Sequence, residues 1–66
     1  MSERETMIRE IYRAAAAGKY PPLQITVYLY NLKARVRTIE ELDDANLTAL
    51  HARMRRYVEW KKETKQ

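Results

Sequence analysis

The sequence predicts an all-α fold, a small helical bundle or helical hairpin of about three helices, with residues 1–66 as a single helical domain. Apolar residues recur at helical spacing in successive segments of the chain, and a glycine and a proline pair separate the first segment from the second. No Asn-Gly or Asp-Gly pair is present to favour a β-hairpin. We expect helices over residues 3–17, 22–37 and 39–63.

The first helix has a start signal and a stop signal. Ser2 and Glu5 have the spacing of a capping box, and Ile8, Ile11 and Ala15 follow at helical intervals. Gly18 suits the left-handed conformation that commonly ends a helix. In the proline pair that follows, the second proline is placed to open the next helix at its first position.

The middle segment is ambiguous between helix and strand. Residues 25–30 are rich in β-branched and aromatic side chains, as in a strand, so a hairpin over residues 24–37 is the alternative. The turn that such a hairpin needs near Asn31 lacks glycine. The helical interpretation is favoured because it aligns Ile25, Leu29, Leu32 and Val36 in one apolar stripe.

A second apolar stripe on this helix contains Leu23, Val27 and Tyr30. Two stripes need two partners: either the first and third helices cover one each, or one stripe faces a second copy of the chain. A chain of 66 residues without cysteine has a thin core and no disulfides, which favours a homodimer. The residues predicted for self-association are Leu23, Val27, Tyr28 and Tyr30, and the pattern does not say which stripe faces the second copy.

The last segment combines two possible helix starts. Thr38 and Glu41 have capping-box spacing, and Asp43 or Asp44 is placed to cap a longer helix. Leu47, Leu50, Met54 and Tyr57 then form its apolar stripe. Whether residues 39–63 form one helix or two stays open.

Charges are unevenly distributed along a chain of net charge +4. Residues 19–38 contain bases and no acid, residues 39–50 contain acids and no base, and bases dominate the remainder. Helix dipoles favour this order, with bases closing the second helix, acids opening the third and bases closing it. The alternative is a nucleic-acid surface, for which the candidate phosphate-binding residues are Lys33, Arg35, Arg37 and Arg55, together with Arg53 and Arg56.

One surface feature is not explained by the helix dipoles. Arg53, Arg56 and Trp60 lie at i, i+3 and i+7, so they share one flank of the last helix. Tryptophan and arginine are enriched among the residues that dominate protein interfaces. We therefore predict a partner-binding site at these three residues. The structural alternative is that Trp60 packs on the first helix or on a second copy of the chain, with the arginine stems lying over it.

Signals for catalysis are missing from the sequence. The only glycine is Gly18, too few for a phosphate-binding loop, and His51 has no acid three or four residues away to orient it as a base. The acids of residues 40–44 match a helix start and lack the order of a calcium loop. We predict that the protein is not an enzyme, with no catalytic residues, no metal site and no cofactor.

Location and family likeness complete the prediction. No segment approaches the length of a membrane span, and the N-terminal residues lack the order of a signal peptide, so we expect a cytoplasmic protein without membrane contact. The run from Thr38 to Met54, followed by an arginine-rich helix with Tyr57 and Trp60, resembles small helical accessory proteins of phages and prophages. That resemblance implies a regulator that acts by binding in a bacterial cytoplasm, and it transfers no site residues.

The expected function is therefore that of a small, non-enzymatic regulatory or adaptor protein. It is expected to act through protein–protein interaction as a homodimer, with an unidentified protein partner. The alternative is a small basic regulator that binds DNA or RNA.

Overall fold

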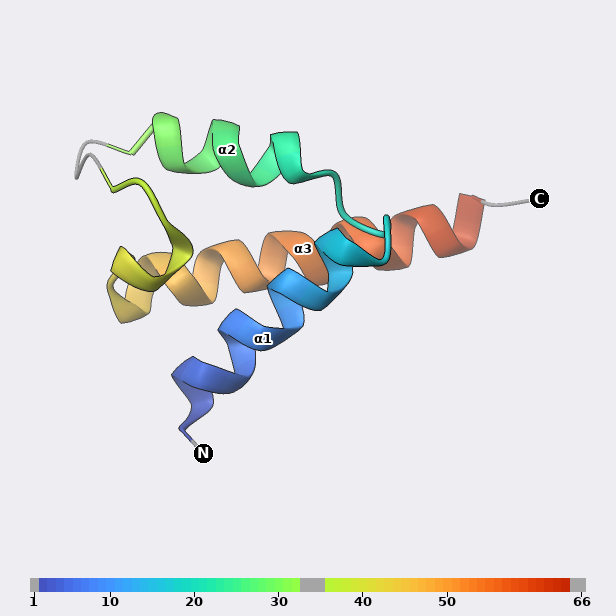
Figure 1. The fold of residues 1–66 in the computed structure, drawn as a ribbon. Coiled ribbons are helices and arrows are strands. Elements are labelled where there is room, and N and C mark those ends of the chain that lie inside the picture. The colour runs from blue at the N-terminus through green and yellow to red at the C-terminus, as the bar shows by residue number, and fades with distance from the viewer. Residues whose placement is uncertain (1, 33–35, 65–66) are drawn as a thin grey trace.

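The computed structural model describes residues 2–32 and 36–64, and within these ranges it contains helices and no strand, which confirms the all-α prediction. The elements are α1 (Glu3–Ala16), α2 (Pro22–Tyr30), a short 3₁₀ helix η1 (Ile39–Glu41) and α3 (Asp44–Thr64). Figure 1 shows α1 crossing α3, while α2 lies beside α3 and runs in the opposite direction. The hairpin alternative for the middle segment is wrong over Pro22–Tyr30.

Both ends of α1 follow local sequence signals. The Ser2 hydroxyl accepts a hydrogen bond from the Glu5 backbone N–H, and the Glu5 carboxylate accepts one from the Ser2 backbone N–H, which confirms the capping box. At the other end Gly18 has φ +75°. The N–H groups of Gly18 and Lys19 donate to the carbonyls of Ala15 and Ala14 at 3.1 and 2.9 Å. This is the Schellman arrangement, which a residue in the left-handed conformation makes possible.

The second helix is shorter than predicted. It begins at Pro22 as expected but ends at Tyr30, so the predicted extension to residue 37 is wrong. Because α2 runs antiparallel to α3, it already ends toward the start of α3. The residues after it leave the helix and bring Ile39 and Leu42 into the core instead of prolonging α2. Leu32 and Val36 still pack against the core, from outside the helix.

The segment before α3 also differs from the prediction. Thr38 stands at the start of η1 without a side-chain cap, and the Glu41 carboxylate accepts a hydrogen bond from the Arg37 backbone N–H at 3.1 Å, so the second capping box is wrong. The Asp43 carboxylate accepts a hydrogen bond from the Asn46 N–H at 2.8 Å and caps α3. Residues 39–63 therefore form a short 3₁₀ turn followed by one long helix.

The core lies where α1, α2, η1 and α3 meet. Leu47, Leu50 and Met54 of α3 are buried against Ile11 of α1, as their helical spacing predicts. The full set of buried apolar residues is Ile11, Ala14, Tyr20, Ile25, Leu29, Ile39, Leu42, Leu47, Leu50 and Met54. Among the described residues, no helix combines the length and apolar character that crossing a membrane requires.

Candidate functional site

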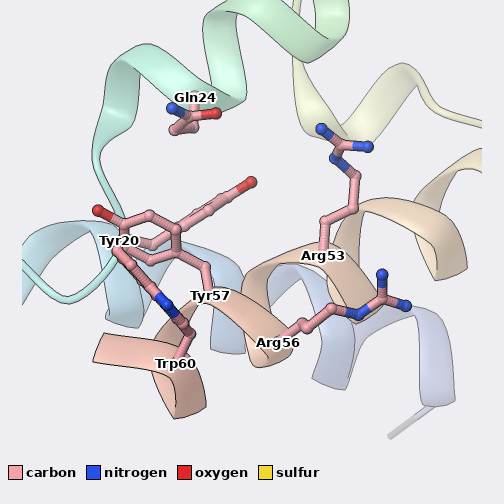
Figure 2. Close-up of a pocket in the computed structure, with 6 residues that line it drawn as sticks. All are labelled: Tyr20, Gln24, Arg53, Arg56, Tyr57 and Trp60. Carbon is pink, nitrogen blue, oxygen red and sulfur yellow. The ribbon is translucent and has the colours of Figure 1, made fainter. Parts of the chain in front are cut away.

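A shallow hollow of about 370 Å³ opens to solvent beside the C-terminal half of α3. Four of its residues lie on one side of α3, a fifth is in the turn between α1 and α2, and the sixth is in the first turn of α2. We call it the Arg/aromatic hollow, and it is lined by Tyr20, Gln24, Arg53, Arg56, Tyr57 and Trp60. Figure 2 shows the three rings gathered on one side and the two guanidinium groups on the other.

The three rings contact one another in series. The ring centroids of Tyr20 and Tyr57 are 5.4 Å apart with an edge-to-face angle of 65°, and those of Tyr57 and Trp60 are 5.8 Å apart at 55°. These separations are typical of favourable aromatic pairs. Tyr20 is only 2% exposed and anchors the series in the core, whereas Trp60 is 55% exposed. The series therefore connects the core with the protein surface.

Arg53 is positioned by its neighbours on α2. Its guanidinium carbon lies 5.5 Å from the centroid of the Tyr28 ring, within the range of a cation–π contact. The Tyr28 hydroxyl in turn donates to the backbone carbonyl of Asn46 at 3.3 Å. Burial raises the pKa of Tyr20, and the positive charge of Arg53 partly offsets that rise. Arg53 is thus placed next to two tyrosines, Tyr28 and Tyr20.

The electrostatic character of the hollow is positive. None of its six lining residues is acidic. Within residues 2–32 and 36–64, no carboxylate lies within ion-pair distance of Arg53 or Arg56. The hollow therefore offers two guanidinium groups and aromatic faces, a combination suited to a group that is both anionic and apolar.

The structure brings the predicted partner-binding residues together. Arg53, Arg56 and Trp60 share the hollow, as their spacing on one helix indicates. Sequence reasoning missed Tyr20 and Gln24, and it placed Tyr57 in the core stripe without assigning it to the site. Tyr20 carried a usable signal, because it lies two residues after the glycine helix stop, where a hydrophobic residue often packs back onto the helix that has just ended.

Of the residues predicted for nucleic-acid binding outside the hollow, Arg37 and Arg55 lie within the described part of the chain and in different segments. Lys33 and Arg35 lie outside the described residues. Arg37 and Arg55 are exposed, but Arg37 precedes η1, whereas Arg55 is on α3. Two positions along a helix correspond to a rotation of about 200°, so Arg55 points away from the side that carries Arg53.

The residues predicted for self-association separate into two faces. Leu23, Val27 and Tyr30 are 69%, 46% and 87% exposed and lie at i, i+4 and i+7, so they form an uncovered apolar face on α2. We call this the α2 face. Tyr28 does not belong to it, because its ring lies under Arg53 and its hydroxyl bonds to α3. The stripe with Ile25 and Leu29 is the one that packs on the core.

His51 has an acidic partner that its own helix does not supply. Its Nε2–H donates to the Glu10 carboxylate of α1 at 2.5 Å. A histidine oriented by a carboxylate resembles part of a catalytic array, but no nucleophile is hydrogen-bonded to the ring in the part of the chain that the structure describes. The described residues contain no group of three or more side chains arranged to hold a metal ion.

Known proteins add no family assignment to this geometry. Comparison of the chain with models of protein families, with characterised proteins and with solved structures finds no match.

Proposed function

We propose that this protein is a small, non-enzymatic adaptor or regulator that binds another protein through the Arg/aromatic hollow. The observation that carries the proposal is the series Tyr20, Tyr57 and Trp60 ending in an exposed ring beside two arginines. Trp, Tyr and Arg are the residue types that most often dominate the energy of protein interfaces. Large rings lose little conformational entropy on binding when neighbouring rings already hold them.

Affinity capture with matched variants tests this proposal. The immobilised protein is offered to a lysate of its native cell, and bound proteins are quantified for wild type, Arg56→Ala, Trp60→Ala and Arg55→Ala. Arg55→Ala removes the same charge from the opposite side of α3, so it controls for non-specific electrostatic binding. A partner that is retained by Arg55→Ala and lost with both other variants is the expected result. Equal retention by Arg55→Ala and Arg56→Ala contradicts the proposal.

We also propose that the protein acts as a homodimer through the α2 face. Three apolar side chains there are open to solvent, including a tyrosine, which protein interfaces favour. α2 has no acidic residue in its first turn and no basic residue in its last, and the sequence Pro22–Tyr30 contains no charged residue at all. In a protein of net charge +4, this uncharged helix is where two copies can approach with least repulsion.

Sedimentation over a range of protein concentrations tests the dimer. Val27→Lys puts a charge into the centre of the α2 face and is expected to shift the protein to monomer, with α-helical circular dichroism retained. Ala52→Lys adds the same charge at an exposed position of α3 and is expected to leave the dimer intact. A wild type that stays monomeric at high micromolar concentration rules the homodimer out.

The proposed setting is a bacterial cytoplasm, in line with the resemblance to phage and prophage accessory proteins. Fractionation of cells that express the tagged protein checks the compartment. DNA or RNA binding has less support than protein binding. Of the described residues of that alternative, Arg53 and Arg56 share the hollow, whereas Arg37 precedes η1 and Arg55 lies on the other side of α3.

A further inference from the structure

We infer that the Arg/aromatic hollow recognises a short acidic peptide segment of the partner. A carboxylate of that segment binds between Arg53 and Arg56, and a neighbouring apolar or aromatic side chain packs on Tyr57 and Trp60. This inference rests on the proposed function and narrows the class of partner. Three observations support it. The acids of residues 40–44 are bound within the fold, Arg53 is held against the Tyr28 ring, and the positive charge of the hollow stops toward the start of α3 and along α2.

The acids of residues 40–44 are all engaged within the fold. Asp44 pairs with Arg4 at 3.0 Å, and Glu40 accepts from the Tyr12 hydroxyl at 2.9 Å. Asp43 caps α3, and Glu41 accepts from the Arg37 backbone N–H. These acids are bound at the other end of α3 and in η1, whereas the two arginines of the hollow have no carboxylate partner among the described residues. These two arginines are therefore open to an anion that another molecule supplies.

The geometry of Arg53 suits a carboxylate. Its guanidinium lies over the Tyr28 ring, and the hydrogen bond from Tyr28 to Asn46 fixes that ring against α3. A guanidinium held in place loses less entropy when it forms hydrogen bonds, and its planar fork matches the two oxygens of a carboxylate. Arg56 lies one helical turn further along the same side of α3, so both groups can reach one anion.

The aromatic side of the hollow supplies the second half of the recognition. Tyr20 closes the floor, Tyr57 is half-buried, and Trp60 presents more than half of its surface to solvent. An apolar or aromatic side chain next to the bound carboxylate would cover this surface and remove it from water. A simple inorganic anion uses only the arginines, so the rings favour a ligand with an apolar part.

The positive charge of the hollow stops toward the start of α3 and along α2, and it continues toward the last turn of α3 with Lys61 and Lys62. A positive surface that ends in two directions favours a peptide over a nucleic acid. Toward the start of α3, the side that carries Arg53 continues with Ala49 and Asn46, both uncharged. The opposite wall is α2, which has no charged residue between Pro22 and Tyr30. Proteins that bind single strands present a positive groove that follows the phosphate backbone over several nucleotides. Two adjacent arginines match one or two carboxylates instead.

Trp60 provides a direct readout, because it is the only tryptophan in the chain and lies in the hollow. The probe is a short capped peptide in which glutamate alternates with phenylalanine. The controls are the same peptide with glutamine replacing every glutamate, and oligothymidylate. We expect a saturable change in Trp60 emission with the acidic peptide and at least tenfold weaker binding of the neutral one, as expected when a charge-assisted hydrogen bond is lost.

Variants of the two arginines test whether the acidic peptide binds in the hollow. Arg53→Gln and Arg56→Gln should each weaken the acidic peptide about tenfold, whereas Arg55→Gln should leave it unchanged. Circular dichroism checks that each variant is folded, and Arg56→Gln keeps the test valid if Arg53→Gln disturbs the packing of Tyr28. Oligothymidylate should produce no saturable change.

Three outcomes overturn the inference. Equal binding of the acidic and neutral peptides removes the role of the arginines, and no saturable change with either peptide removes the site. Tighter binding of oligothymidylate than of the acidic peptide, with a steep dependence on salt, assigns the hollow to nucleic acid. If the acidic peptide does not bind while partner capture still depends on Arg56 and Trp60, the protein-binding proposal stands, and the partner is recognised through a different chemistry.

Discussion

Nε2 of His51 on α3 lies 2.5 Å from the Glu10 carboxylate on α1, so a single hydrogen bond joins two helices across 41 positions of sequence. The His51 side chain is 14% exposed, while that of Glu10 is about half exposed. The contact therefore lies at the edge of the α1–α3 interface, next to the buried Leu47 and Leu50. It adds a directional contact near the apolar core of the α1–α3 interface, at a different point from the Arg4–Asp44 ion pair.

Removal of the Glu10 carboxylate should destabilise the fold modestly. Glu10→Ala leaves a largely buried imidazole without its acidic partner, and we expect a loss of about 0.5–1.5 kcal/mol in the free energy of unfolding. Urea denaturation followed by circular dichroism measures it. Glu59→Ala, at an exposed position of α3, is the control and should change stability by less than about 0.5 kcal/mol. Equal midpoints for the two variants would mean that the Glu10–His51 contact contributes nothing.

Arg4 should contribute more than its ion pair alone. Its guanidinium donates to the Asp44 carboxylate at 3.0 Å, to the Glu40 carbonyl at 2.8 Å and to the Leu42 carbonyl, and so ties the first turn of α1 to η1 and the start of α3. Arg4→Met is expected to cost about 1–2 kcal/mol, because carbonyls at the helix junction lose their donor. Asp44→Asn is expected to cost less than about 1 kcal/mol, because Asp44 is exposed.

Denaturant titration separates these two contributions. Arg9→Met, at an exposed position of α1, controls for loss of a surface charge and should behave like wild type. If Asp44→Asn costs as much as Arg4→Met, the ion pair and not the carbonyl contacts holds the junction.

Local signals explain which parts of this fold the sequence predicts correctly. The capping box at Ser2, the glycine stop at Gly18 and the start at Pro22 involve neighbours within a few residues, so the sequence displays them. The end of α2 at Tyr30 depends on the packing of the following residues, Ile39 and Leu42 among them, into the core, which no local pattern encodes. The contact between Glu10 and His51 likewise depends on how α1 crosses α3.

The candidate site likewise contains residues that local sequence spacing predicts and residues that only the tertiary fold brings in. Arg53, Arg56 and Trp60 belong to one helix, and their spacing alone places them on one flank. Tyr20 and Gln24 reach the hollow because the chain reverses after Gly18 and α2 packs beside α3. The sequence therefore indicates the α3 wall of the hollow, and the tertiary fold is needed to reveal its floor and its second wall.

Gly18 should be required for its backbone conformation and not for space. Its φ of +75° is in the left-handed region, and a Cβ built there meets nothing within 4 Å. Gly18→Ala should therefore cost about 1 kcal/mol from conformational strain alone, and Gly18→Asn should cost less because asparagine tolerates this region better. Thermal unfolding of both variants measures the difference. A neutral Gly18→Ala would mean that the turn relaxes to another conformation, and a larger loss for Gly18→Asn than for Gly18→Ala would point to a steric limit.

The pair of Tyr12 and Glu40 should make stability depend on alkaline pH. Burial raises the pKa of Tyr12, and the hydrogen bond that its hydroxyl donates to Glu40, at 2.9 Å, raises it further together with the negative charge of that carboxylate. Because the folded protein favours the protonated phenol, this contribution is fully present below about pH 10 and is lost as the pH rises through the raised pKa of Tyr12. Tyr12 is 45% exposed, so solvent screening keeps the contribution below about 1 kcal/mol.

Two variants resolve this effect. The stability of wild type relative to Tyr12→Phe should be highest at neutral pH and should decrease above about pH 10, since an ionised phenol beside Glu40 is unfavourable. Glu40→Gln removes the neighbouring negative charge and should lower the pKa of Tyr12 toward its ordinary value, as measured by the ultraviolet absorbance of the phenolate. If wild type and Tyr12→Phe lose stability in parallel as the pH rises, the ionisation of Tyr12 is not coupled to folding.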